Sequence, residues 1–192
     1  MECSHIVLPF VDASSLQNDK ESIPTLIELL TSEFTSALAE TNISLALELD
    51  LAPKAVSQLL NSIDSPVISI NYDIGNSAAL GFNTITELEA YGDRVSDVHI
   101  KDRILGGQSV LLGTGAANFT QVFSALKQLN YNDLIVMQAY REFLGVPELS
   151  TQVQWLKKEF SEFFFGWPSS WWLLEAGKTI LSPRFFSASS MP

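Results

Sequence analysis

The chain has 192 residues, 46% of them hydrophobic, which is enough for one compact core but short of the ~250 residues typical of a closed (β/α)₈ barrel. Its formal net charge of -11 disfavours nucleic acid and anionic membrane surfaces as partners, and no apolar run reaches the ~20 residues that a membrane-spanning helix needs. Because Cys3 is the single cysteine and no secretory signal follows Met1, we expect a cytoplasmic protein without an internal disulfide.

Five short apolar runs predict β-strands that are buried on both faces. In chain order they are residues 6–10, 43–49, 67–71, 95–100 and 134–138. Amphipathic helices are predicted between them, from apolar positions spaced three and four apart within residues 23–38, 56–60 and 119–129. Pro53 suits a first helical turn, and Asn118, with Gln121 three residues later, suits an N-cap. Strands that alternate with helices predict an α/β fold with a parallel sheet.

Aromatic residues gather near the C-terminus, where nine of the twenty in the chain fall within the last 33 residues. The periodicity of the rest is lost there, and Pro168, Pro183 and a serine-rich end break any helix. We therefore divide the chain into a first part, residues 1–160, and an atypical aromatic-rich tail, residues 161–192. The tail either covers open edges of the sheet or is an aberrant extension.

Each of the last four predicted strands ends on a polar side chain: Glu48, Asp73, His99 and Gln138. Periodicity alone does not separate an open doubly wound sheet from a closed barrel, but in a barrel the C-terminal strand ends converge on one mouth. Two carboxylates, an imidazole and an amide oxygen together suit Mn²⁺, Mg²⁺, Co²⁺ or Zn²⁺. Taken singly, each residue is more often a cap, a loop acid or a satisfied histidine than a metal ligand.

Four short motifs lie at or beyond these strand ends. They are LALE at residues 45–48, NYDIGN at 71–76, DVHIKD at 97–102 and LGTG at 112–115. Together they resemble the sugar phosphate isomerase/epimerase superfamily, the xylose isomerase-like barrels. The resemblance covers about residues 6–158 and implies a partial (β/α)₈ TIM barrel made of the fourth to eighth βα units. It also implies that Glu48, Asp73 and His99 are metal ligands, and that Gln138 replaces a second glutamate of many members.

The resemblance implies isomerisation or epimerisation of a sugar or sugar phosphate, in which a divalent metal stabilises an enediolate and Glu48 moves the proton. Family members use two glutamates for proton transfer on opposite faces of the sugar. An amide cannot accept that proton near neutral pH, although the Gln138 oxygen can still bind a metal. The alternative is a catalytically impaired barrel fragment or pseudoenzyme that binds metal or carbohydrate without turnover.

Apurinic-site endonucleases, the DNA-repair branch of the same barrels, are a third alternative. They need a histidine-rich zinc cluster and a basic face, which two histidines and a charge of -11 do not provide. We therefore expect no nucleic-acid partner. Because a partial barrel leaves strand edges open, a homo-oligomer is a further expectation.

Three basic residues near the strand ends are expected to bind substrate: Lys101, Arg103 and Arg141. Lys101 lies two residues after His99, so strand alternation points it to the same face. It is about equally expected to pair with Asp102 or Asp73 instead. The two arginines could clamp a phosphate, although local ion pairs at the surface are the commoner role of arginine.

Two glycines lie in the loop at residues 112–115, which follows the fourth predicted strand. Gly113 and Gly115 could offer backbone amides to an anion, as loops at the mouth of a barrel often do. Two glycines in a turn are, however, also ordinary turn chemistry.

Overall fold

The computed structural model describes residues 4–41, 43–138, 140, 146–163, 173–175 and 178–181. All five predicted strands are present: β1 (His5–Phe10), β2 (Ser44–Leu49), β3 (Ile68–Asp73), β4 (Val95–Ile100) and β7 (Leu134–Met137). Parallel pairing joins β1 to β2, β2 to β3 and β4 to β7. The strand order is β1-β2-β3-β4-β7-β9-β8, so the five predicted strands are neighbours in chain order within the sheet of an α/β fold.

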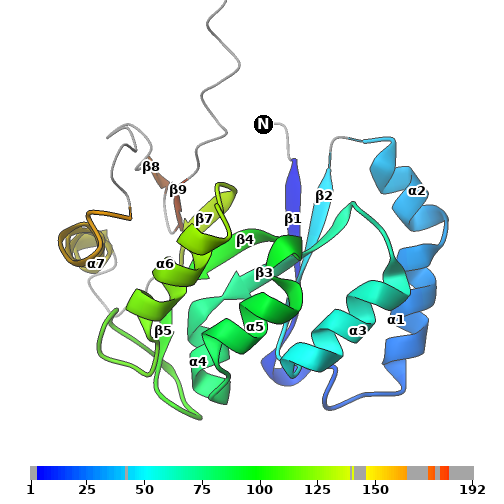
Figure 1. Ribbon diagram of the computed structural model, residues 1–192, viewed down its shortest axis with the longest axis horizontal. Helices are drawn as coiled ribbons and strands as arrows, with labels where there is room; N and C mark the ends of the chain where they lie inside the picture. The colour runs from blue at the N-terminus through cyan, green and yellow to red at the C-terminus, as the bar shows by residue number, and fades with distance from the viewer. Residues whose placement is uncertain are drawn as a thin grey trace, which may run out of the picture. The chain divides into compact units, whose positions relative to one another are not determined.

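Two compact units make up the chain. The first comprises residues 1–72 and 86–96, and the second comprises residues 73–85 and 97–192. The first unit contains β1, β2, nearly all of β3 and the 3-10 turns η1 (Asp12–Ser14) and η2 (Gly92–Arg94). Its helices are α1 (Ser22–Thr31), α2 (Glu33–Ala39), α3 (Pro53–Ile63) and most of α5 (Thr84–Tyr91). Figure 1 shows β1 and β2 side by side. Their parallel register runs from His5 opposite Ser44 to Phe10 opposite Leu49.

One of the predicted helices is broken. Residues 23–38 form α1 and α2 with Ser32 between them, because Ser32 has an extended backbone. The hydroxyls of Thr31 and Ser32 donate to the carbonyl oxygens of Ile27 and Leu29, and such bonds compete with the helical ladder. By contrast, α3 begins at Pro53 as predicted and buries an apolar stripe against the core of this unit.

The second unit contains β4 from Asp97 onward and β7, which pair in register from Asp97 opposite Leu134 to Ile100 opposite Met137. It also contains α4 (Ile74–Leu80), α6 (Phe119–Gln128), α7 (Val146–Glu159) and a two-stranded ribbon of β5 (Asp102–Arg103) and β6 (Ser109–Val110). The predicted cap of α6 is confirmed, because the Asn118 side chain accepts the N–H of Gln121 at 3.0 Å.

Aromatic rings join α6 to α7. The ring centroids of Phe119 and Trp155 are 5.6 Å apart, and those of Phe123 and Phe160 are 4.8 Å apart, both in edge-on geometry. These contacts pack α7 and the residue that follows it against α6. No helix in the described residues is long and apolar enough to cross a membrane.

The tail forms two further strands, β8 (Leu173–Glu175) and β9 (Lys178–Leu181). β9 pairs antiparallel with β7, and β8 pairs antiparallel with β9, so the tail extends the sheet beyond β7 (Figure 1). Of the two alternatives for the tail, this pairing favours the one in which it covers a sheet edge.

Candidate metal centre

Asp73 ends β3 and begins α4, and its two carboxylate oxygens have separate partners. Oδ1 accepts the backbone N–H of Asn76 at 2.7 Å and so caps the helix. Oδ2 lies 3.8 Å from Nδ1 of His99 and 3.5 Å from Nζ of Lys101. The residue is buried, so Oδ2 is held in the second unit facing two nitrogen-bearing side chains and no water-filled surface.

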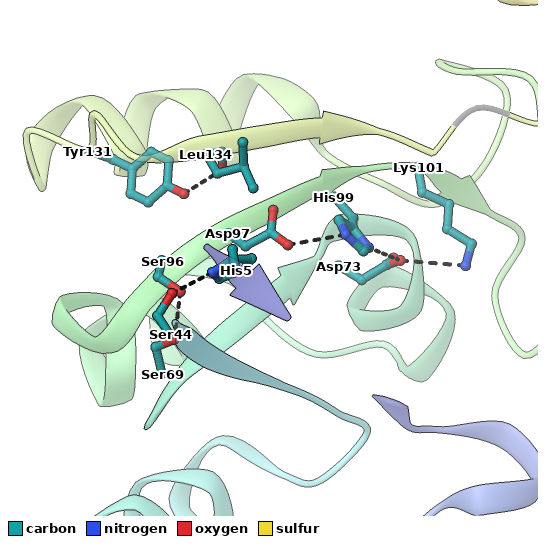
Figure 2. Close-up of polar contacts among 10 residues, drawn as sticks. All are labelled: His5, Ser44, Ser69, Asp73, Ser96, Asp97, His99, Lys101, Tyr131 and Leu134. Atoms are coloured by element: carbon teal, nitrogen blue, oxygen red, sulfur yellow. Dashed lines mark hydrogen bonds and ion pairs between the residues drawn. The ribbon is translucent and has the colours of Figure 1, made fainter. Parts of the chain in front are cut away.

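His99 lies on β4 between two carboxylates. Its Nε2 is 3.3 Å from Oδ2 of Asp97, and its Nδ1 faces Asp73, as Figure 2 shows. Burial alone lowers the pKa of His99, but Asp73 and Asp97 outweigh it and raise that pKa to about 9. Without a metal, the ring is therefore an imidazolium at neutral pH.

Glu48 is buried near the end of β2 in the first unit, where it stands opposite Asn71 of β3. Glu48, Asp73 and His99 each offer one ligand atom to a cation, and the two that belong to the second unit, Oδ2 of Asp73 and Nδ1 of His99, lie 3.8 Å apart. The set combines carboxylate oxygens with an imidazole nitrogen, which is a donor set that Mn²⁺, Co²⁺ and Zn²⁺ accept.

Gln138 follows β7, and its backbone N–H continues the ladder with β4 by donating to the Ile100 oxygen at 3.0 Å. Its side-chain Oε1 is buried and accepts no hydrogen bond from the described residues. Asp73 Oδ2 and His99 Nδ1 are also buried, and their contacts within the described residues are the ion pairs with Lys101 and with each other. A buried acceptor is seldom left without a donor, and a cation would satisfy Gln138 Oε1 and also bind Nδ1 once His99 has lost its proton. The residues of the strand ends therefore fit a divalent metal.

Asp97 is a residue that the sequence reasoning left without a role. Its exposed fraction is 1%, and it lies on the same face of β4 as His99 because the two are separated by one residue. The spacing of two residues in a strand is the feature of the sequence that could have predicted the contact between Asp97 and His99. A carboxylate on the second nitrogen of a metal-binding histidine is a frequent arrangement in metal sites.

Lys101 pairs with Asp73, which is one of the two acidic partners expected for it. The approach depends on Gly75, because a Cβ at that position would come within 2.8 Å of Cγ of Lys101. The side chain is largely buried and its ammonium faces the same oxygen as His99. The role of Lys101 in substrate binding stays a prediction.

Arg103 is held by two hydrogen bonds within the second unit. Nε donates to the Gly107 oxygen, and Nη1 donates to Oδ1 of Asn76, both at 2.8 Å. The guanidinium thus ties the ribbon of β5 and β6 to α4. Its proposed contact with a phosphate stays a prediction, and Arg141 lies outside the described residues.

The glycine loop refines one expectation. Asp102 is buried, and its carboxylate accepts the backbone N–H groups of Gly113 and Gly115 at 2.9 Å and that of Ala117 at 3.1 Å. The amides of Gly113 and Gly115 do bind an anionic group, but it is the Asp102 carboxylate of the chain itself, so they are not open to a bound ligand. The φ of Gly113 is 82° and its Cα faces Trp155, so a turn that requires glycine is the better description.

Comparison with known proteins identifies related chains. The profile of the xylose isomerase-like TIM barrel family matches residues 1–159. An inosose dehydratase from Geobacillus kaustophilus (strain HTA426) is 24% identical over 105 residues, which are 45% of this chain and 34% of the relative. The chain thus spans about a third of the length of this curated relative.

Two solved structures show the same fold. A D-tagatose 3-epimerase-like protein has a TM-score of 0.66 and 19% identity, over 83% of this chain and 63% of that chain. The IolI protein with a bound zinc atom has a TM-score of 0.63 and 20% identity, over 84% of this chain and 64% of that chain. Since the family profile covers most of the sequence, the chain belongs to the xylose isomerase-like TIM barrel family.

Proposed function

We propose that Glu48, Asp73, His99 and Gln138 bind one divalent metal, and that the chain contributes to isomerisation or epimerisation of a sugar or sugar phosphate. The observation that carries the proposal lies within the second unit, where buried Asp73 Oδ2 is 3.8 Å from Nδ1 of His99 and the buried Oε1 of Gln138 has no donor among the described residues. The names of the relatives, a dehydratase of inosose and an epimerase-like protein, agree with a small carbohydrate substrate. The fourth to eighth units of a barrel are the part of the fold that we assign to this chain.

The chemistry assigns separate tasks to the residues. A bound divalent metal would polarise a carbonyl and its neighbouring hydroxyl, which makes the hydrogen on the intervening carbon more acidic. Glu48 is the base that would remove this proton; delivering it to the neighbouring carbon on the same face completes an isomerisation, whereas an epimerisation needs a water to supply a proton to the same carbon from the opposite face. Lys101, Arg103 and Arg141 are the proposed contacts to substrate oxygens or phosphate.

Gln138 limits what the site can do. Its amide oxygen can donate a lone pair to a cation but cannot take a proton near neutral pH, so Glu48 must act alone or with a water. This favours a reaction that uses one base, and it also supports the second candidate, a catalytically impaired chain that binds metal or carbohydrate without turnover. The single cysteine agrees with a reducing, cytoplasmic setting.

The metal assignment is tested by calorimetric titration of the metal-free chain with Mn²⁺. Asp73→Asn and His99→Gln each remove a proposed ligand. Each should lower the affinity for Mn²⁺ by more than the roughly 10–100-fold that is typical when a residue hydrogen-bonded to a ligand is replaced. Asp93→Asn is the control, because Asp93 is exposed on η2 in the first unit. Equal affinity in wild type and both ligand variants would refute the site.

Turnover is tested separately by solvent exchange. In deuterated water with Mn²⁺, an active chain should place deuterium on the carbon next to the carbonyl of candidate ketoses, and Glu48→Gln should abolish this exchange. Metal binding without any exchange, on sugars and on their phosphates, would favour the impaired chain.

A further inference from the structure

Asp97 lies behind His99 on β4, on the side of the ring away from Asp73. Its Oδ2 is 3.3 Å from Nε2, while Nδ1 on the other side is 3.8 Å from Asp73 Oδ2 (Figure 2). The two nitrogens of one imidazole point in different directions, so a cation on Nδ1 cannot also be bound by the carboxylate that faces Nε2. Asp97 is therefore excluded as a direct ligand of that cation.

We propose that Asp97 is a positioning residue that fixes the tautomer and orientation of His99. The inference rests on the proposed metal site. A neutral imidazole carries one proton, and the nitrogen that keeps it cannot bind a metal. Asp97 accepts the N–H of Nε2, so the lone pair of Nδ1 is presented to the cation beside Asp73.

Three features of the second unit support this assignment. Asp97 is 1% exposed, so water does not compete for its contact with the ring. The shorter of the two distances to His99 is on the Asp97 side, and Nδ1 has no hydrogen-bond partner among the described residues. Strand alternation fixes both side chains on one face of β4, so the pairing does not depend on a loop.

Removal of the charge should reverse the tautomer. In Asp97→Asn the amide N–H can donate to Nε2, which moves the ring proton to Nδ1 and takes away the ligand lone pair. The affinity for Mn²⁺ should fall roughly 10–100-fold, which is the usual loss when a residue hydrogen-bonded to a histidine ligand is replaced. Asp97→Glu keeps the acceptor and should recover part of the affinity. Asp93→Asn, which removes an exposed acid from the neighbouring 3-10 turn, should bind Mn²⁺ like the wild type.

A second measurement reads the tautomer directly in metal-free protein. The chain has two histidines, so His5→Gln leaves the ring of His99 as the only imidazole in a ¹⁵N spectrum. In alkaline buffer, where the ring is neutral, the signals should show the proton on Nε2 in this background. Adding Asp97→Asn should shift it to Nδ1.

The outcomes separate the two proposals. If the wild type binds no Mn²⁺, the proposed function fails, and the tautomer alone then decides whether Asp97 fixes the ring. If the wild type binds Mn²⁺ through His99 but its neutral ring carries the proton on Nδ1, the role of Asp97 is refuted. Unchanged affinity and tautomer in Asp97→Asn would refute it as well. Should that variant fail to fold, the spectrum of the His5→Gln chain still gives the answer.

Discussion

Gln138 sets the amount of negative charge around the proposed metal. With Glu48 and Asp73 as the two anionic ligands, Gln138→Glu adds a third carboxylate with little change in volume. We expect Mn²⁺ to bind roughly tenfold or more tightly, because the added Coulomb attraction acts in a partly desolvated site. The substitution also restores a second base, so any proton exchange into a ketose should become faster. Calorimetry and deuterium exchange measure the two effects.

The matched control is Gln138→Ala, which removes the amide oxygen without adding charge. It should weaken Mn²⁺ binding. If the glutamate variant binds no better than the alanine variant, Gln138 does not face the metal, and the assignment of β7 within the family pattern is wrong.

The raised pKa of His99 predicts how metal affinity depends on pH. Since that pKa is about 9 in the metal-free chain, the ring must lose a proton before Nδ1 can bind a cation. The affinity for Mn²⁺ should therefore rise with pH through the neutral range, by about tenfold per unit where one proton is displaced, and level off above the pKa. Titrations in buffers of different ionisation enthalpy should show the release of that proton. A flat profile between pH 6 and 8 would contradict a histidine ligand with this pKa.

The sequence predicted which residues are candidate metal ligands, but it did not predict which residues hold those ligands and the neighbouring loop in place. Glu48, Asp73 and His99 were found because polar residues at the ends of buried strands are conspicuous. Asp97 and Asp102 stand in the same motif, yet a carboxylate in a motif does not name its partner. The partner of Asp102 is a loop that returns from Gly113, and only the folded chain shows this contact.

Among the elements, the loop after β6 depends on one side chain. Asp102 accepts three backbone N–H groups from this loop in a buried position, and Asp102→Ala leaves all three without a partner. We expect the free energy of unfolding to fall by about 2–4 kcal/mol, since buried bonds to charged groups are among the strongest. Urea denaturation measures the loss, with Asp93→Ala as a control for removing an exposed acid. A difference below about 1 kcal/mol would mean that water replaces these contacts.

Strands were easier to predict than the pieces between and after them. Four of the five predicted strands are mostly buried, and a buried apolar run has few other conformations. The prediction that the first strand is buried on both faces is wrong, because Ile6 and Leu8 of β1 are exposed. The two-residue strands β5 and β6 are too short to leave a pattern. The break at Ser32 involves hydroxyl contacts that a hydrophobic period does not record. The local sequence of β9 does not name its partner, which is β7.

For the molecule as a whole, the two outer strands raise the question of open edges. In the described residues β1 pairs with β2 alone and exposes 41% of Ile6 and 37% of Leu8, whereas β7 is covered by β9. Removing the residues after Phe163 takes β9 away and leaves the edge of β7 open. We expect the shortened chain to melt at a lower temperature and to self-associate more.

Light scattering after size exclusion and a thermal melt test this prediction. The 192-residue chain should already form a homo-oligomer through the edge at β1, because exposed apolar side chains on an edge strand favour pairing. A monodisperse monomer whose cooperative melting is unchanged by the truncation would count against both statements.

Asp73 binds a helix with one oxygen and faces the candidate cation with the other. The backbone nitrogen of Asn76 is 2.7 Å from Oδ1, so the chemical shift of its amide proton depends on the electron density of the carboxylate. When Oδ2 gives electron density to a cation, Oδ1 becomes a weaker acceptor and the proton of Asn76 should move upfield. The backbone amide signal of Asn76 should therefore report whether the proposed site holds diamagnetic Zn²⁺ or Mg²⁺, and no substrate is needed for the measurement.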